Sequence, residues 1–171
     1  NYSVWAGTTM QSIVENTKAP IVFHILHDDT LNEMNKNKLS LIADNSGNGI
    51  EFHHFNPDIF GSLADSMNRF TIGTMFRIML PDIMPDLKKI IYLDSDLFVN
   101  TDIEELWNLN IDNYCLAAAQ DCSTIRNWGT PYAVAAGQTS RDRYFNAGVL
   151  CMNLDNIRKN GSLFQQVMDY L

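Results

Sequence analysis

The chain has 171 residues, 46% of them hydrophobic, and a formal net charge of −8 from 12 basic and 20 acidic residues. This size and hydrophobic content suit one globular domain, residues 1–171, with a core of its own. The acidic balance argues against a nucleic-acid partner, because binding to a phosphate backbone relies on clustered Lys and Arg. No apolar run approaches the roughly 20 residues of a membrane-spanning helix, so we predict no membrane span.

The cysteines and the chain ends indicate the context of this domain. Cys115, Cys122 and Cys151 are odd in number and lack CxxC spacing, which favours reduced thiols in a cytoplasmic protein over disulfides or a zinc knuckle. The chain begins at Asn1 without a leader sequence, and the helical pattern of residues 162–171 reaches the last residue without a stop signal. We therefore expect a domain that is incomplete at both ends.

In chain order, the first half alternates between apolar residues at helical spacing and short runs of β-branched and aromatic residues. Thr30 is a plausible N-cap of the second helix, and Pro81 should end the third. The pattern predicts helices at 5–14, 30–42 and 71–80, and strands at 21–26, 50–55 and 88–93.

The second half continues with a short helix at 104–107 and a strand at 114–120. Residues 121–143 show no clear period and predict a long functional loop, followed by the run at 144–150 and a final helix from 162. Helices that alternate with strands predict an α/β fold: a mostly parallel, Rossmann-like sheet with helices on both faces. Ligands of such sheets bind at the carboxyl ends of the strands.

The strand around Ile90–Leu93 ends directly in Asp94-Ser95-Asp96. In an extended segment side chains alternate, so Asp94 and Asp96 project to the same side. Their mutual repulsion is offset by a bound Mg²⁺ or Mn²⁺, a hard cation that also holds phosphate oxygens. Two solvated acidic residues in a turn explain the tripeptide equally well, so geometry leaves both interpretations open.

The surrounding motifs favour the metal. The string from Lys89 to Val99, followed by Ile103 to Trp107, resembles the metal-binding segment of glycosyltransferase family 8, which includes glycogenin and bacterial lipopolysaccharide galactosyl- and glucosyltransferases. Residues 144–154 are similar to the family's FNAGV…NL signature. Residues 70–77 resemble its helix with an Arg that faces the nucleotide, and Asn1-Tyr2 resembles the segment that meets the uracil. The resemblance spans the chain.

This resemblance implies a GT-A-type nucleotide-diphospho-sugar transferase fold. It implies transfer of galactose or glucose, with retention of configuration, from a UDP-sugar to a hydroxyl of lipopolysaccharide or another glycan, lipid-linked or protein acceptor. The cofactor would be Mn²⁺ or Mg²⁺. A peripheral membrane contact through sequence beyond this chain would fit the same family.

The resemblance also assigns residues. Asn146 would hold the transferred sugar, Gly148 would permit close backbone approach, and Asp121 would face the sugar. Each residue type has a simpler role: Asn146 suits a turn, Asp121 a loop, and Arg77 a helix surface. The positions expected at the metal and donor are Asp94 and Asp96 as metal ligands, with Ser95, Thr74, Arg77, Asn1 and Tyr2 at the donor.

Two alternatives stay open. Haloacid-dehalogenase-like phosphohydrolases also place Asp-x-Asp after a strand, but they expect Thr or Val where Phe98 stands and place the motif in the first strand. A non-catalytic sugar-nucleotide-binding domain would keep the fold without turnover. The family's third metal ligand, a downstream His, is not matched here, because all four histidines lie upstream in or beside predicted strands, where packing or a strand-end hydrogen bond is expected.

Overall fold

The computed structural model describes residues 2–56, 58, 72–121 and 145–170. Strands and helices alternate along most of the chain, which confirms the α/β class. The predicted loop at 121–143 lies, from residue 122 on, outside the described residues. In chain order the elements are α1 (Ser3–Asn16), β1 (Val22–His27), α2 (Glu33–Asn45), β2 (Gly49–His54), α4 (Ile72–Ile83), β3 (Lys89–Leu93), α5 (Glu104–Trp107), β4 (Leu116–Gln120), β5 (Phe145–Asn153), α8 (Leu154–Arg158) and α9 (Leu163–Tyr170).

The described strands form two groups. β1 and β2 pair in parallel, as expected for strands joined through a helix, with His24 opposite Glu51. β5 lies between β3 and β4 and runs antiparallel to both. No helix was predicted between the last two strands, and without a helical crossover successive strands pair readily in the antiparallel direction. The sheet is therefore more mixed than the sequence pattern indicated.

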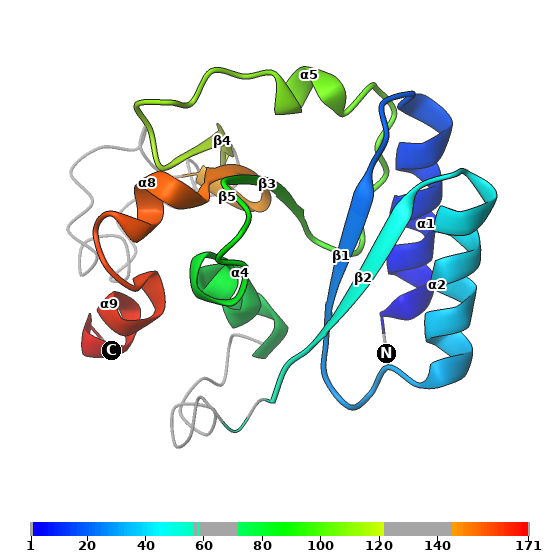
Figure 1. Ribbon diagram of the computed structural model, residues 1–171, viewed down its shortest axis with the longest axis horizontal. Helices are drawn as coiled ribbons and strands as arrows, with labels where there is room; N and C mark the ends of the chain where they lie inside the picture. The colour runs from blue at the N-terminus through cyan, green and yellow to red at the C-terminus, as the bar shows by residue number, and fades with distance from the viewer. Residues whose placement is uncertain (1, 57, 59–71, 122–144, 171) are drawn as a thin grey trace.

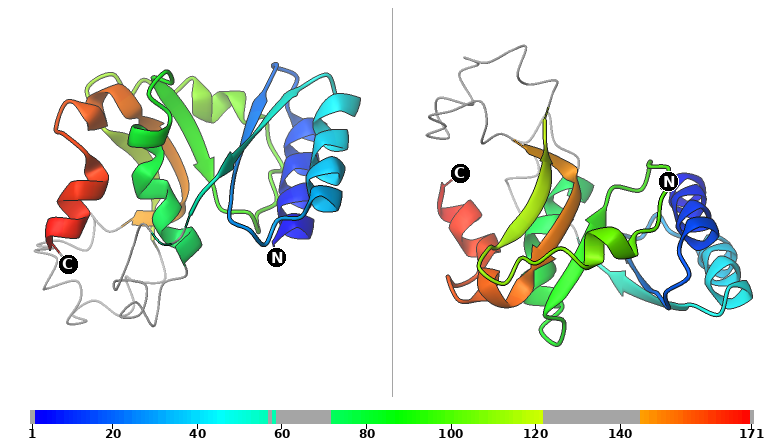
Figure 2. Two further views of the ribbon diagram at one scale, coloured as in Figure 1. Left: turned by 60° about the horizontal axis from the view of Figure 1, so that its bottom comes forward. Right: turned by 90° about the horizontal axis from the view of Figure 1, so that it is seen from above.

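Helices cover both groups of strands (Figures 1 and 2). α1 and α2 pack on one face of β1 and β2, and α4 and α8 pack against β3 and β5. None of the helices in the described part of the chain has the length and apolar character needed to cross a bilayer. The best-buried members of the two main cores are Met10, Ile13, Leu39 and Ala43 in the first, and Leu80, Leu150, Met152 and Leu154 in the second.

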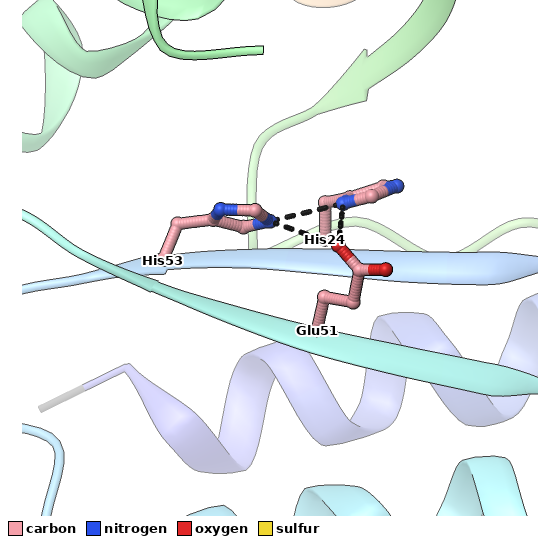
Figure 3. A group of neighbouring side chains, drawn as sticks. All are labelled: His24, Glu51 and His53. Carbon is pink, nitrogen blue, oxygen red and sulfur yellow. Dashed lines mark hydrogen bonds and ion pairs between the residues drawn. The ribbon is translucent and has the colours of Figure 1, made fainter. Parts of the chain in front are cut away.

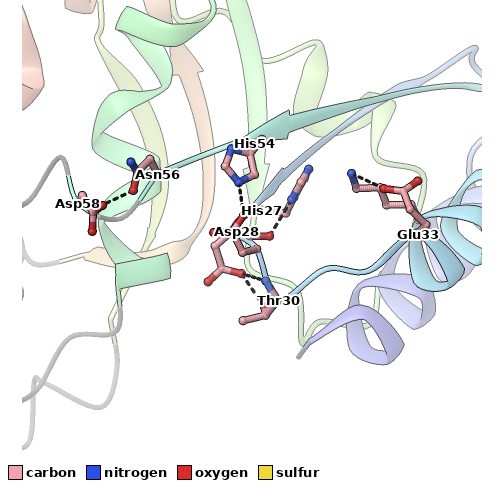
Figure 4. A network of polar contacts seen from close by, with 9 residues as sticks. His27, Asp28, Thr30, Glu33, His54, Asn56 and Asp58 are labelled. Atoms are coloured by element: carbon pink, nitrogen blue, oxygen red, sulfur yellow. Dashed lines mark hydrogen bonds and ion pairs between the residues drawn. The ribbon is translucent and has the colours of Figure 1, made fainter.

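Two predicted helix boundaries were wrong. Helix α4 continues through Pro81 to Ile83, and the Pro81 carbonyl accepts a hydrogen bond from Arg158 at 3.0 Å. Pro81 has no N–H to donate within the helix, yet the helix continues past it, and the Met84 N–H still bonds to the Leu80 carbonyl at 3.1 Å. At the start of α2 the N-cap is Asn32, because the Thr30 hydroxyl donates instead to Asp28 Oδ1 at 2.6 Å (Figure 4).

Candidate functional site

A cavity of about 1030 Å³ lies between β1 and β3. Within the described residues β1 pairs only with β2, and β3 only with β5, so the facing edges of the two strands border this space. The cavity reaches the carboxyl end of β3, where the sequence placed the metal site. It brings together five of the predicted residues: Tyr2, Arg77, Asp94, Ser95 and Asp96.

Asp94 is the best-anchored side chain at this end of β3. Its Oδ1 accepts hydrogen bonds from Arg77 Nη2 at 2.9 Å and from the Tyr92 hydroxyl at 2.8 Å. Arg77, which comes from α4 and is 13% exposed, also donates from Nη1 to the Ala147 carbonyl. Arg77 thus joins α4, β3 and β5 at one point and fixes the Asp94 carboxylate.

Tyr92 is part of the site and was missed in the sequence. Its ring lies 4.7 Å from the Arg77 guanidinium carbon, a cation–π contact. Burial and the hydrogen bond to Asp94 raise the pKa of Tyr92, and the charges of Asp94 and Asp96 act in the same direction. The hydroxyl therefore stays protonated and donates. The signal was available, because in a strand residues 92 and 94 face the same side.

The predicted Asn146 and Gly148 lie at this same end of the sheet. The Gly148 N–H donates to Asn146 Oδ1 at 2.8 Å, which is the turn contact expected of Asn146. The Asp94 N–H donates to the Gly148 carbonyl at 2.8 Å. A Cβ at Gly148 would lie 2.8 Å from Asp94 Oδ2 and 3.1 Å from Asn146 Oδ1, so only glycine fits between the two side chains.

The backbone after Asp94 is held by α1. The Thr9 hydroxyl lies 2.9 Å from the Ser95 carbonyl and 2.7 Å from the Leu97 carbonyl, and accepts from the Leu97 N–H at 3.1 Å. The Ser12 hydroxyl accepts from the Val99 N–H at 2.9 Å. Nothing in the local sequence predicts these contacts, because they join residues more than 80 positions apart.

The structure describes only some of the remaining predicted residues. Asp121 follows β4, whose last residue Gln120 pairs with Phe145, so it lies at the same end of the ladder as Asn146. The Thr74 backbone belongs to α4, while its side chain and Asn1 lie outside the described residues.

The donor atoms fit a hard divalent cation. Both described bonds of the Asp94 carboxylate reach Oδ1, and Oδ2 faces the space that a Cβ at Gly148 would fill. Asp96 is exposed at the cavity. Carboxylate oxygens suit Mg²⁺ or Mn²⁺ rather than a softer metal.

Sequence comparisons place these residues in a known context. A family model described as glycosyl transferase family 8 matches residues 1–171. The chain is 30% identical over 170 residues to a Haemophilus influenzae protein named "Putative glycosyltransferase". This alignment covers 99% of this chain and 50% of that protein. It is 32% identical over 161 residues to glycosyltransferase 8 domain-containing protein 1 of Danio rerio. That alignment covers 91% of this chain and 41% of the relative. The chain thus spans about half the length of these relatives.

Structural comparison agrees. The galactosyltransferase LgtC, solved in complex with donor and acceptor sugar analogues, matches with a TM-score of 0.84 at 26% identity, covering 99% of this chain and 60% of that chain. The likeness confirms the GT-A-type fold. Since the family model covers every residue, the chain belongs to glycosyltransferase family 8.

Proposed function

We propose that this chain is the donor-binding part of a retaining hexosyltransferase that moves galactose or glucose from a UDP-sugar to an acceptor hydroxyl. The observation that carries the proposal is the carboxyl end of β3, where Asp94 is fixed by Arg77 and Tyr92 beside the glycine-lined gap at Gly148. A family member with a fixed carboxylate at a cavity has the elements needed to hold a diphosphate through a metal.

Asp94 and Asp96 would hold Mn²⁺ or Mg²⁺. When bound, the ion would neutralise charge on the departing UDP as a Lewis acid. Ser95, Arg77, Thr74, Asn1 and Tyr2 would bind and orient the nucleotide. Asn146 and Asp121, at the same end of the β4–β5 ladder, would hold the transferred sugar and place it against the acceptor.

The finer assignments rest on the family. We propose that residues 1–171 form one catalytic domain; they cover 50% of the Haemophilus influenzae relative and 60% of LgtC. A lipopolysaccharide or other glycan acceptor, whether lipid-linked or protein-linked, stays a prediction, as do peripheral membrane contact and a cytoplasmic location. Membership of glycosyltransferase family 8 argues against the haloacid-dehalogenase-like phosphohydrolase alternative. A non-catalytic binding domain stays as the competing hypothesis, which a sugar-transfer assay on the longer protein would decide.

Binding of UDP tests the proposal on this chain. Calorimetry should show UDP binding with Mn²⁺ or Mg²⁺ and none with chelator. Asp96→Ala should abolish the metal-dependent binding, because it removes one of the two carboxylates. Asp86→Ala is the matched control, since Asp86 is an exposed aspartate on the turn before β3 and is not among the residues that line the cavity. Equal UDP affinity with metal and with chelator would contradict the metal-dependent donor site.

A further inference from the structure

A second group of possible metal ligands lies in the middle of the β1–β2 ladder. The register places His24 opposite Glu51 and Leu26 opposite His53, so the three polar side chains project from one face of the pair (Figure 3). The intervening residues, such as Phe23 and Phe52, face the other side and pack in the core with α1 and α2. Strand pairing alone therefore brings His24, Glu51 and His53 together.

The three atoms nearest one another have the spacing of metal ligands. His24 Nδ1 lies 3.0 Å from His53 Nε2 and 3.4 Å from Glu51 Oε2, and His53 Nε2 lies 3.7 Å from Glu51 Oε2. Tetrahedral Zn²⁺ with bonds of about 2.0–2.1 Å holds its ligand atoms about 3.3 Å apart. The three atoms thus approximate one face of a zinc tetrahedron.

Hydrogen bonds alone pair the three side chains of this cluster only in part. A carboxylate only accepts hydrogen bonds, and each neutral imidazole has a single N–H, so one proton at His24 Nδ1 cannot serve both neighbours fully. Charging both rings would place two cations 3.0 Å apart. Burial lowers the pKa of His24, with Glu51 opposing and His53 adding to this effect, so the neutral ring with an available lone pair is favoured. A single divalent cation would accept all three lone pairs at once.

We propose that His24, Glu51 and His53 form a zinc site separate from the Asp94–Asp96 site. Two imidazoles and one carboxylate are a zinc donor set that leaves a fourth position open to water. The Glu51 side chain is 60% exposed, which gives the ion a path from solvent. Nitrogen ligands also distinguish this site from the all-oxygen ligands at β3, which suit Mg²⁺ or Mn²⁺. Zinc binding at this site is proposed independently of the glycosyltransferase activity.

Zinc affinity, measured by competition with a chromophoric chelator, tests the proposal. His24→Gln and His53→Gln should each weaken Zn²⁺ binding at least about tenfold, since even outer-shell partners of metal ligands contribute that much. His54→Gln is the matched control, because His54 is the next residue on β2 but bonds to Asp29 at 2.8 Å (Figure 4). Asp96→Ala should leave this zinc affinity unchanged. Equal affinity in the wild type and His53→Gln would overturn the proposal.

A second measurement needs no variant and so does not depend on variant folding. In NMR spectra of the wild-type chain, Zn²⁺ should shift the ring signals of His24 and His53 at one equivalent while those of His54 stay in place. Co²⁺ in the same site should give the intense visible absorption of tetrahedral coordination. Ring signals of His24 and His53 that do not respond to Zn²⁺ would also overturn the proposal.

Discussion

Gly148 sets how closely β5 approaches the Asp94 carboxylate. A methyl group there would meet Asp94 Oδ2 at 2.8 Å, closer than van der Waals contact allows. We predict that Gly148→Ala displaces the carboxylate, at an overpacking cost of about 1–3 kcal/mol. The affinity for UDP with Mn²⁺ should then fall about tenfold or more, a loss of about 1.4 kcal/mol in binding free energy, because the displaced carboxylate is a proposed metal ligand.

Calorimetry of UDP with Mn²⁺ checks this prediction, and Gly7→Ala is its control. A Cβ at Gly7, on α1, would meet Ile42 at 3.4 Å, an ordinary contact, and alanine favours the helix. Gly7→Ala should therefore bind UDP like the wild type. Unchanged UDP affinity in Gly148→Ala would show that Asp94 is not confined in this way.

Tyr92 holds Asp94 from the strand side. Tyr92→Phe removes the hydrogen bond to Asp94 Oδ1 but keeps the ring over Arg77. We expect a loss of about 1–2 kcal/mol in the free energy of unfolding, because the bond reaches a charged acceptor. Urea unfolding measures this loss, and Tyr114→Phe, at an exposed tyrosine, should cause little change. Equal destabilisation by both variants would contradict the role of the Tyr92 hydroxyl.

The turn after β1 contains a carboxylate whose titration follows from its contacts. The Thr30 hydroxyl, more than any other group, lowers the pKa of Asp28 below 3.8. A carboxylate with a lowered pKa in the folded state stabilises the fold above its unfolded pKa, and this contribution is lost as pH falls through the folded pKa. In Thr30→Val the pKa of Asp28 should rise toward 3.8, because the largest cause of its lowering is removed while the backbone hydrogen bonds and the smaller effect of His27 remain.

A ¹³C NMR titration of the Asp28 carboxyl carbon measures that pKa. Thr8→Val, on the exposed side of α1, should leave it unchanged, since the Thr8 hydroxyl bonds only within its own helix in the described structure. A pKa of Asp28 that is the same in Thr30→Val and the wild type would contradict the assigned cause.

Helix α1 holds the backbone after Asp94 in place and also contributes residues to the core. Thr9 is 5% exposed and its hydroxyl contacts the Ser95 and Leu97 backbone. Thr9→Val would leave half-buried backbone groups without this partner, so we expect a loss of about 1–3 kcal/mol in unfolding free energy. Since the same loop carries Asp96, metal-dependent UDP binding should weaken as well.

Thr8→Val is again the matched control, because it changes the neighbouring threonine and touches no residue of the loop. Chemical denaturation and UDP calorimetry give the two readouts. If Thr9→Val were as stable as Thr8→Val and bound UDP as tightly, α1 would have no part in holding the loop.

Sequence patterns predicted the elements better than their ends. The apolar period located α1, and the β-branched runs located β1 and β3. The start of α2 was missed because Asp28 binds Thr30 and shifts the cap to Asn32. The end of α4 was missed because proline was expected to stop the helix, whereas α4 continues through Pro81 to Ile83.

At the scale of the whole molecule, strand topology decides which parts of the site were predictable. The rule that ligands bind at strand ends predicted a site at Asp94, and Asp94 lines the cavity. The position of Gly148 against Asp94 depends on β5 running antiparallel beside β3. This pairing is a feature of the tertiary structure that the local sequence does not predict. The His24–Glu51–His53 cluster depends likewise on the β1–β2 register, which no local pattern contains.

The separation of β1 from β3 leads to a prediction about association. Strand edges without a neighbouring strand present backbone groups that pair with other chains, and lysine on an edge strand discourages such pairing. Val22, at the start of β1, is 53% exposed and lines the cavity. Sedimentation velocity should show concentration-dependent association of the wild-type chain and less association in Val22→Lys.

Val4→Lys adds the same charge at an exposed position on α1 and should associate like the wild type. A monomeric wild-type chain at all concentrations would contradict the prediction.

The cavity therefore has a consequence beyond ligand binding. In residues 2–56, 58, 72–121 and 145–170, the edges of β1 and β3 that border the cavity have no neighbouring strand. Any extended peptide of suitable length that enters this space gains main-chain hydrogen bonds whatever its side chains are. We therefore expect the open strand edges at this cavity to lower the solubility of the chain and to bind unfolded peptides, including during refolding.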